Sequence, residues 1–343
     1  MEPTLQQIAA RMVAKGKGIL AADESNRTAT KRLDSINMES NPDNRRAYRE
    51  LFLGMEGVEN YLSGVILYDE TIRQTMSDGT PFAKHLENIG VIPGIKVDMG
   101  LQDLPNFPGE KYTAGLDGLR ERLKEYHEMG ARFAKWRALI TISEPKASDV
   151  CMHVNAHGMA MYAALCQEAG IVPIVEPEVL LEGSHSIEES YEVTKKALET
   201  LFAALKYMKV ELDGVILKSS MVLSGKQAEN RADAQTVGEM TYKCLSETVP
   251  VEVPGVVFLS GGQTAEEATE NMYEVNKAAQ VAGGAPWELT FSFARALQGP
   301  SLAIWAGEDT NIPAAREKFL ERLTVNSAAR NGEKVGNGVE VAA

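Results

Sequence analysis

The 343-residue sequence contains only three cysteines, Cys151, Cys166 and Cys244, and no two of them form a CxxC pair. So few cysteines, odd in number, give neither a disulfide framework nor a thiolate cage for a metal. No apolar run approaches the length of about 20 residues that spans a bilayer, and the N-terminus lacks a basic region leading into an apolar one. We therefore expect a cytoplasmic protein that does not bind membranes.

Basic residues are also under-represented, with 35 Lys and Arg against 48 Asp and Glu, which gives a formal charge of −13. Nucleic acids and anionic membranes bind positively charged surfaces, so this balance excludes a general nucleic-acid or membrane binder. It does not exclude a small anionic substrate, which senses only a local pocket. Aromatic residues make up 6% of the chain, but 44% of the residues are hydrophobic, enough for a sizeable core.

Eight short runs rich in Val and Ile recur along the chain, and each ends in a polar or charged residue. Runs of this length without clean alternation are typical of strands buried on both faces, as in a parallel sheet. The runs span residues 18–23, 64–69, 92–98, 131–137, 171–176, 213–218, 255–260 and 289–295.

Segments with helical periodicity lie between these runs. Residues 116–126 carry apolar side chains at three- and four-residue spacing before Gly130, and residues 187–208 show the same pattern. Ser186 and Thr264 are each followed three residues later by a glutamate, the spacing of a capping box at the start of a helix.

Eight alternating strand–helix units predict an α/β fold, a (β/α)8 TIM barrel. No Pro- or Gly-rich linker divides the chain, so we expect one domain with enlarged loops over residues 1–330, followed by a flexible tail over residues 331–343. The alternative is an open doubly wound sheet, but the position after the first strand, residues 23–28, lacks its GxGxxG motif.

Charged residues gather at the predicted carboxyl ends of the strands, where barrel enzymes place their active sites. A single charged residue there is by default a solvated loop residue, whereas many at equivalent ends must be paired or used. Those that we single out are Asp23, Lys96, Asp98, Lys135, Arg137, Glu176, Glu178, Lys218, Ser260 and Arg295.

Lys218 directly follows an apolar run and so lies at the lip of a buried strand. Apolar walls and nearby cations such as Lys135 or Lys96 lower the pKa of an amine, and only a neutral amine forms a Schiff base with a carbonyl. Asp23 or Glu176 could then relay protons. The same pattern also fits a buried lysine that is paired with a carboxylate and has no chemical role.

Residues 260–262, Ser-Gly-Gly, end the seventh run just before the helix capped by Thr264. Free N–H groups in a glycine turn beside a helix N-terminus can hold an anion, and Arg295 could add a bidentate donor. A simple tight turn is the alternative. His153 and His157 lack the glutamate of HExxH, and the chain has no GxSxG, so we expect neither a metal site nor a serine triad.

At these residues the sequence resembles the class I, Schiff-base fructose-bisphosphate aldolases. The similarity covers most of the chain. It is carried by GKGILAADES from residue 16, GVILYDETIRQ from 64, GIKVD from 94, FAKWRA from 133, GIVPIVEPE from 170, LKSSMV from 217, FLSGGQ from 258 and RALQ from 295.

The resemblance implies reversible cleavage of fructose 1,6-bisphosphate to dihydroxyacetone phosphate and glyceraldehyde 3-phosphate, without metal or other cofactor, in a homo-oligomer expected to be a tetramer. It makes Lys218 the Schiff-base lysine, Glu176 the general acid/base that dehydrates the carbinolamine, Asp23 a participant in C–C cleavage, and Lys135 a residue that positions substrate. The implied substrate and phosphate contacts are Arg32, Lys96, Arg137, Glu178, Ser260, Gly261, Gly262, Ser292 and Arg295.

The chain departs from the family pattern in three places. It ends in Val-Ala-Ala rather than the tyrosine common in the family, residues 293–294 are Phe-Ala rather than Tyr-Gly, and Met99 replaces a common lysine. A Schiff-base aldolase for another keto-sugar phosphate, or a catalytically weakened binding or scaffold protein, therefore stay open as alternatives. We expect two separate basic clusters, Arg32 with Lys96 and Ser260 with Arg295. We also expect the excess acid to lie elsewhere, while six cations gather at one face: Arg32, Lys96, Lys135, Arg137, Lys218 and Arg295.

Overall fold

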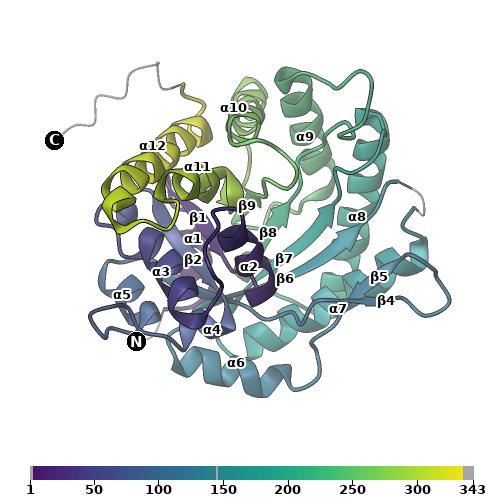
Figure 1. Ribbon diagram of the computed structural model, residues 1–343. Coiled ribbons are helices and arrows are strands. Elements are labelled where there is room, and N and C mark those ends of the chain that lie inside the picture. Colours follow the sequence, from purple (N-terminus) through teal and green to yellow (C-terminus); the bar gives the residue numbers. More distant parts are fainter. Residues whose placement is uncertain (1–2, 144–145, 335–343) are drawn as a thin grey trace.

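Eight parallel strands close into a barrel in the computed structural model, which describes residues 3–143 and 146–334 (Figure 1). The strand order around the barrel is β1-β10-β9-β8-β7-β6-β3-β2. This confirms the (β/α)8 barrel and excludes the open doubly wound sheet. The strands are β1 (Gly18–Ala22), β2 (Leu62–Leu67), β3 (Ile92–Lys96), β6 (Phe133–Ile140), β7 (Val172–Val179), β8 (Ile216–Ser219), β9 (Gly255–Phe258) and β10 (Glu288–Phe293).

Helices surround the barrel, and their termini follow the caps that the sequence predicts. Ser186 and Thr264 both form complete capping boxes with the glutamate three residues on, and Gly130 has the positive φ of 103° expected after a helix end. The helices are α1 (Leu5–Met12), α2 (Asn26–Asp34), α3 (Pro42–Leu53), α4 (Asp69–Ile72), α5 (Phe82–Asn88), α6 (Leu119–Glu128), α7 (Asp149–Glu168), α8 (Ile187–Tyr207), α9 (Ala234–Thr248), α10 (Ala265–Val281), α11 (Arg295–Trp305) and α12 (Ile312–Arg330), with 3-10 turns η1 (Val58–Asn60), η2 (Leu212–Gly214) and η3 (Asp309–Asn311).

The barrel interior is filled by apolar side chains and is not a pore. Ile19, Ile66, Phe133 and Val257 belong to one buried cluster with the apolar face of α1, which contacts β2 and β7. Gly94 of β3 leaves the space for the Phe133 ring, because a Cβ at that position would overlap it. The packed interior leaves the carboxyl ends of the strands free to form a site.

Two features of the fold differ from the sequence prediction. An antiparallel hairpin of β4 (Leu101–Asp103) and β5 (Lys111–Thr113) follows β3, where we expected no strand. In addition, β6 and β7 continue to Ile140 and Val179, so Arg137 and Glu176 lie within their strands and do not end them. The physical reason is the two-residue period of a strand, which lets charged side chains face the barrel mouth while the strand continues.

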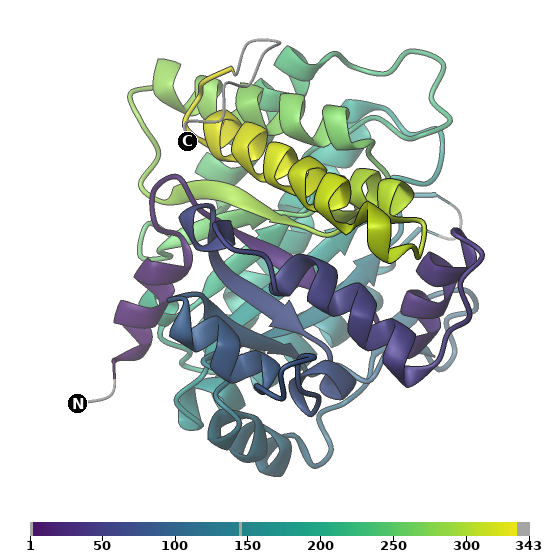
Figure 2. The same ribbon diagram turned by 60° about the vertical axis from the view of Figure 1, so that its left-hand side comes forward.

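The C-terminal helix α12 packs along α10 and α11 (Figure 2). Arg330, its last residue, is buried and donates hydrogen bonds to the carbonyls of Ala14 and Lys17 and pairs with Glu288. Of the expected tail, residues 331–334 are described, and Lys334 pairs with Glu270; residues 335–343 lie outside the described residues. Over the described ranges, none of the helices combines the length and the apolar character that a bilayer crossing requires.

Candidate active site

A cavity of about 920 Å³ opens at the carboxyl ends of the barrel strands. All fourteen residues that the sequence and the family resemblance single out line it, although they come from segments far apart in the chain. They are Asp23, Arg32, Lys96, Asp98, Lys135, Arg137, Glu176, Glu178, Lys218, Ser260, Gly261, Gly262, Ser292 and Arg295.

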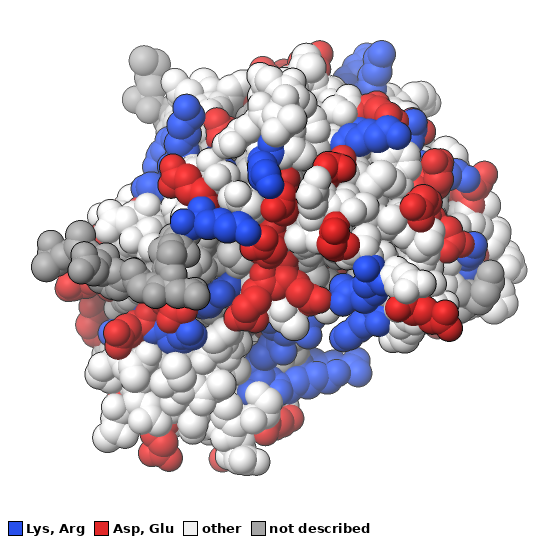
Figure 3. All heavy atoms as spheres, turned by 90° about the horizontal axis from the view of Figure 1, so that it is seen from above, with Lys and Arg blue, Asp and Glu red and all other residues white. Residues whose placement is uncertain are grey.

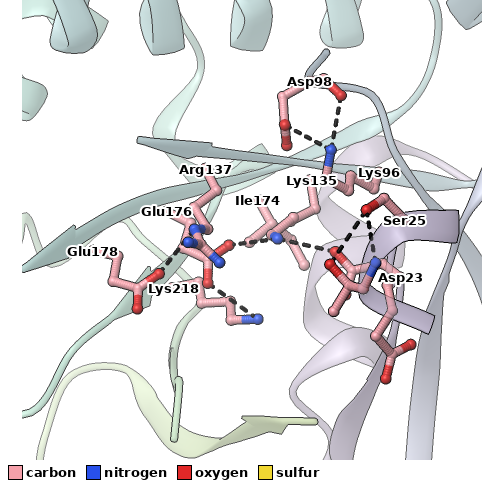
Figure 4. A network of polar contacts seen from close by, with 12 residues as sticks. Asp23, Ser25, Lys96, Asp98, Lys135, Arg137, Ile174, Glu176, Glu178 and Lys218 are labelled. Carbon is pink, nitrogen blue, oxygen red and sulfur yellow. Dashed lines mark hydrogen bonds and ion pairs between the residues drawn. The ribbon is translucent and has the colours of Figure 1, made fainter. Parts of the chain in front are cut away.

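The Lys135 ammonium lies at the centre of the cavity between two carboxylates (Figure 4). Its Nζ is 2.9 Å from Oδ2 of Asp23 and 2.9 Å from Oε2 of Glu176. The other oxygen of Glu176, Oε1, lies 3.3 Å from Nζ of Lys218. Lys135, Glu176 and Lys218 lie on the neighbouring strands β6, β7 and β8, and Asp23 follows β1. The four side chains form one row of alternating charge.

Burial and pairing shift the pKa values of this network in opposite directions. Burial lowers the pKa of Lys218, the attraction of Glu176 opposes this, and the nearby Lys135 ammonium lowers it further, so the net pKa is below the ordinary value. Burial alone would also lower the pKa of Lys135, but Asp23 and Glu176 raise it well above the ordinary value. The two lysines therefore have different protonation properties: Lys135 stays charged and Lys218 loses its proton more readily.

The two carboxylates next to Lys135 remain ionised although they are buried. Burial raises the pKa of Asp23, but the ammonium groups of Lys135 and Lys218 outweigh it and hold that pKa below the ordinary value. The same competition lowers the pKa of Glu176, with Arg137 as a further cation. Each carboxylate can therefore accept a proton from a reacting group.

Two further ion pairs flank this network. Nε of Arg137 lies 2.9 Å from Oε2 of Glu178, and Nζ of Lys96 lies 2.6 Å from Oδ1 of Asp98. Burial raises the pKa of the Glu178 carboxyl, and repulsion from Glu176 adds to this against the attraction of Arg137. These pairs fix the walls of the cavity on both sides of Lys135.

The Ser-Gly-Gly turn after β9 requires its glycines. A Cβ at Gly261 would lie 2.7 Å from Oε1 of Glu178, and Gly262 has a φ of 76°, which side chains disfavour. Near this turn, the buried hydroxyl of Ser292 has no hydrogen-bond partner among the described residues. The turn thus presents bare backbone to the cavity rather than serving as a tight turn alone.

Arg32 and Arg295 line the cavity without an acidic partner among the described residues, whereas Arg122, which also lacks one, is held by the backbone carbonyls of Val97 and Gly115. Within residues 3–143 and 146–334, neither the Arg32 nor the Arg295 guanidinium has a side-chain hydrogen bond or an ion pair, and Nε of Arg32 is buried without a partner. Arg295 is the first residue of α11, whose N-terminus has no side-chain cap. Unpaired guanidinium groups beside an uncapped helix N-terminus form an anion site.

All the residues of the two expected basic clusters line the main cavity, including Arg32 and Lys96. Arg32 and Arg295 also line a second cavity of about 420 Å³, of which Lys96 is not part. Arg32 and Arg295 thus line both cavities.

The six cations expected to gather at one face, Arg32, Lys96, Lys135, Arg137, Lys218 and Arg295, all line the main cavity. The main cavity is lined by eight basic and eight acidic side chains, so its formal charge is zero rather than positive. Burial explains this balance, since most of these charges are stable only in pairs. The excess acid does lie outside the cavity, and Figure 3 shows acidic side chains among Lys and Arg on one outer face.

Several lining residues were missed by the sequence reasoning. Glu24, Ser25, Thr28 and Tyr68 line the cavity. Ser25 caps α2 by accepting a hydrogen bond from the N–H of Thr28. Its position as a hydroxyl residue after a strand and before a helical segment was the signal that could have identified it.

The three departures from the family pattern have different surroundings. Met99 is 66% exposed at the rim of the cavity. Phe293 is fully buried against Phe291, so the hydroxyl that it lacks would fall in the core, while Ala294 lines the cavity. The C-terminal residues lie outside the described residues.

The two histidines considered for metal binding are far from this chemistry. His153 and His157 lie on the exposed face of α7. Among the described residues, no group of three or more His, Cys, Asp or Glu side chains is arranged to hold a metal ion.

Comparison with known proteins agrees with this geometry. The family model described as fructose-bisphosphate aldolase class-I matches residues 4–343. A probable fructose-bisphosphate aldolase class 1 of Xanthomonas campestris is 51% identical over 97% of this chain and 98% of its own length. The cytosolic fructose-bisphosphate aldolase 6 of Arabidopsis thaliana is 49% identical over 96% of this chain and 91% of its own.

A solved structure has the same fold. The fructose-bisphosphate aldolase of Plasmodium falciparum, crystallised with TRAP and a small-molecule inhibitor, superimposes with a TM-score of 0.94 at 46% identity and covers 97% of this chain and 95% of its own. With a family match over nearly the whole sequence, relatives near 50% identity and this barrel, the chain belongs to the class I fructose-bisphosphate aldolase family.

Proposed function

We propose that the protein cleaves fructose 1,6-bisphosphate reversibly into dihydroxyacetone phosphate and glyceraldehyde 3-phosphate through a Schiff base on Lys218. The observation that carries the proposal is the buried Lys218 amine, whose pKa is lowered by burial and by Lys135 and whose Nζ lies 3.3 Å from Glu176. A lysine of this kind supplies the neutral amine that attacks a ketone. Membership of the class I family supports the same reaction.

In the proposed mechanism, Nζ of Lys218 attacks the substrate ketone to form a carbinolamine. Glu176, ionised at rest, first accepts the proton of the Lys218 ammonium, which frees the amine, and then donates that proton to the departing hydroxyl, so that water leaves and the iminium forms. Asp23 accepts the proton of the substrate C4 hydroxyl as the C3–C4 bond breaks and its electrons move to the iminium nitrogen. Lys135 stays charged between the two carboxylates and holds them in place.

The two phosphates of the substrate find separate positions in the cavity. Arg32, Arg295 and the Ser-Gly-Gly turn form an unneutralised anion site for one of them. Lys96 and Arg137, both in ion pairs, line the same cavity and would exchange a carboxylate partner for the second phosphate. A doubly phosphorylated sugar therefore suits the cavity better than a monophosphate.

The direct test is an aldol-cleavage assay with a chelator present, combined with borohydride trapping. We expect fructose 1,6-bisphosphate and borohydride to leave a covalent adduct on Lys218, and Lys218→Met to lose both cleavage and adduct. Lys84→Met, at an exposed lysine of α5, is the matched control and should retain both. Cleavage that survives in Lys218→Met, or a wild type that is inactive, would refute the proposal.

A comparison of substrates distinguishes the alternatives. Turnover of fructose 1-phosphate equal to that of the bisphosphate would favour a different keto-sugar phosphate as the physiological substrate. Sugar-phosphate binding without turnover would favour a binding or scaffold protein.

We also propose a cytoplasmic homo-oligomer, with a tetramer as the family expectation. Val150, Val154 and Met161 are exposed apolar residues on one stripe of α7, and the exposed Tyr207 ring lies near His157 of the same helix. Such a stripe is typical of an interface between subunits. Sedimentation equilibrium of the wild type and of Val154→Glu tests this, and a monomeric wild type would refute it.

A further inference from the structure

Glu24 directly follows Asp23 at the end of β1, and its side chain is held by two consecutive residues of α3. The hydroxyl of Tyr48 donates a hydrogen bond of 3.0 Å to Oε1 of Glu24. Arg49 forms an ion pair with Oε2 of Glu24, and its Nη2 donates a 2.7 Å hydrogen bond to the backbone carbonyl of the same residue. One guanidinium thus holds both the side chain and the main chain next to Asp23.

This contact is buried, so the free energy needed to remove its charges from water is large. Glu24, Tyr48 and Arg49 are 7%, 0% and 3% exposed. Apolar residues of similar volume in place of a buried ion pair are often neutral or stabilising, so stability alone does not require these charges. What the ion pair adds is a fixed position for the backbone carbonyl and carboxylate of Glu24.

The helix that provides the two donors is itself firmly packed. The Tyr48 ring lies 5.4 Å from the Phe52 ring in an edge-on contact, and Phe52 lies 4.9 Å from Phe319 of α12. Helix α3 also contacts α2, which begins immediately after Ser25 (Figure 1). A shift of Glu24 relative to α3 is therefore opposed from two sides.

The position of Glu24 bears directly on Asp23. The two Cα atoms are linked by one peptide bond, about 3.8 Å apart, and the carboxylate of Asp23 depends on a 2.9 Å contact with Lys135 across the barrel. Small displacements of reacting groups have large effects on rate. Movement of the β1–α2 turn would lengthen this contact first.

We propose that Arg49 is a positioning residue which, through Glu24, holds the Asp23 carboxylate against Lys135 in the geometry needed for C–C cleavage. The inference rests on the proposed aldolase function. It adds α3, a helix outside the reacting network, to the elements that set the rate of the reaction.

The first test is Arg49→Lys, which keeps the positive charge but cannot hold the side chain and the carbonyl of Glu24 together. We expect kcat for bisphosphate cleavage to fall about tenfold, with KM within about twofold of the wild type. Arg46→Lys is the matched control, since Arg46 lies on the same helix and pairs with Glu50 of α3. It should change neither parameter.

The pH profile separates positioning from a general loss of folded protein. The charged groups around Asp23 are Lys96 on β3, Lys135 on β6 and Lys218 on β8, together with Arg49 on α3. A longer contact with Lys135 raises the pKa of Asp23 toward its ordinary value, so the acid limb of kcat should move to higher pH by about half a unit or more. Partial unfolding would lower the amplitude without moving the limb.

If Arg49→Lys does not fold, the same measurements on Tyr48→Phe decide the matter. That variant removes a single hydrogen bond to Glu24, and we expect a smaller decrease in kcat, about twofold to threefold, with the limb moving in the same direction. A folded variant whose kcat and acid limb both match the wild type overturns the inference. A wild type without cleavage activity instead refutes the proposed function, so the two failures are distinguishable.

Discussion

Replacement of Lys218 by methionine is expected to abolish activity and at the same time to stabilise the protein. The lysine is buried, and burial lowers its pKa despite the attraction of Glu176 at 3.3 Å. A lowered pKa means that the native environment disfavours the ammonium relative to water. Methionine fills a similar volume without charge, and Glu176 keeps its 2.9 Å contact with Lys135.

The size of the effect follows from two opposing contributions. For each unit by which the pKa of Lys218 is lowered, the protonated lysine destabilises the native state by about 1.4 kcal/mol. Replacement by methionine removes this cost, but it also removes the 3.3 Å ion pair with Glu176, which offsets part of the stabilisation. Replacement of buried charges by apolar residues stabilises by about 1–4 kcal/mol in favourable cases. We therefore expect Lys218→Met to increase the free energy of unfolding at pH 7 by about 1–2 kcal/mol, or Tm by about 1.5–3 °C.

The stability difference between wild type and Lys218→Met should depend on pH. Because the pKa of Lys218 is lower in the native than in the unfolded chain, the unfolded state binds more protons between the two values, and wild-type stability rises with pH there. The cost of the lysine is therefore full below the native pKa and disappears as the pH approaches its ordinary value of 10.5. The advantage of the methionine variant should be largest at neutral pH and shrink as the pH rises.

Calorimetry or urea unfolding of wild type and Lys218→Met at several pH values between 7 and about 10 measures this difference. Lys84→Met serves as the control, because a surface substitution of this kind changes stability by less than about 0.5 kcal/mol. A methionine variant clearly less stable than the wild type at pH 7, or a difference that does not depend on pH, would show that Lys218 is a structural ion-pair residue.

Three other substitutions test the site and the fold. Lys135→Met leaves the buried Asp23 without its ion-pair partner and Glu176 with Lys218 alone, so the free energy of unfolding should fall by about 3–5 kcal/mol, and the pKa of Asp23 should rise; urea unfolding and the acid limb of the pH–rate profile check this, and an unchanged limb would contradict it. Gly94→Ala places a Cβ against the Phe133 ring and should cost about 1–3 kcal/mol; the double variant with Phe133→Leu should recover part of this loss, and no recovery would mean that the ring is not the obstacle. Thr264→Ala removes the hydroxyl of the capping box and should lower stability by about 0.5–2 kcal/mol in thermal unfolding with KM nearly unchanged; full stability would show that the cap contributes nothing.

The eight-strand barrel could be predicted because each strand corresponds to a short apolar run in the sequence. Strand ends were less certain: β6 and β7 extend beyond Arg137 and Glu176, since pairing with neighbouring strands, not local sequence, sets where a strand stops. The β4–β5 hairpin was missed because its six strand residues are mostly polar and exposed. Short exposed strands carry no hydrophobic pattern that could reveal them.

For the site, the sequence by itself determined which residues are available: Lys218 at the lip of a buried strand, acids and bases at equivalent strand ends, and a glycine turn before a capped helix. Only the tertiary structure decided how they pair. Lys135 lies between Asp23 and Glu176, Arg32 and Arg295 line a second cavity together, and the mouth is balanced in charge rather than basic. The physical reason is that a pKa or an ion pair depends on distances of about 3–4 Å between groups, and closure of the barrel alone brings such distant segments of the chain together.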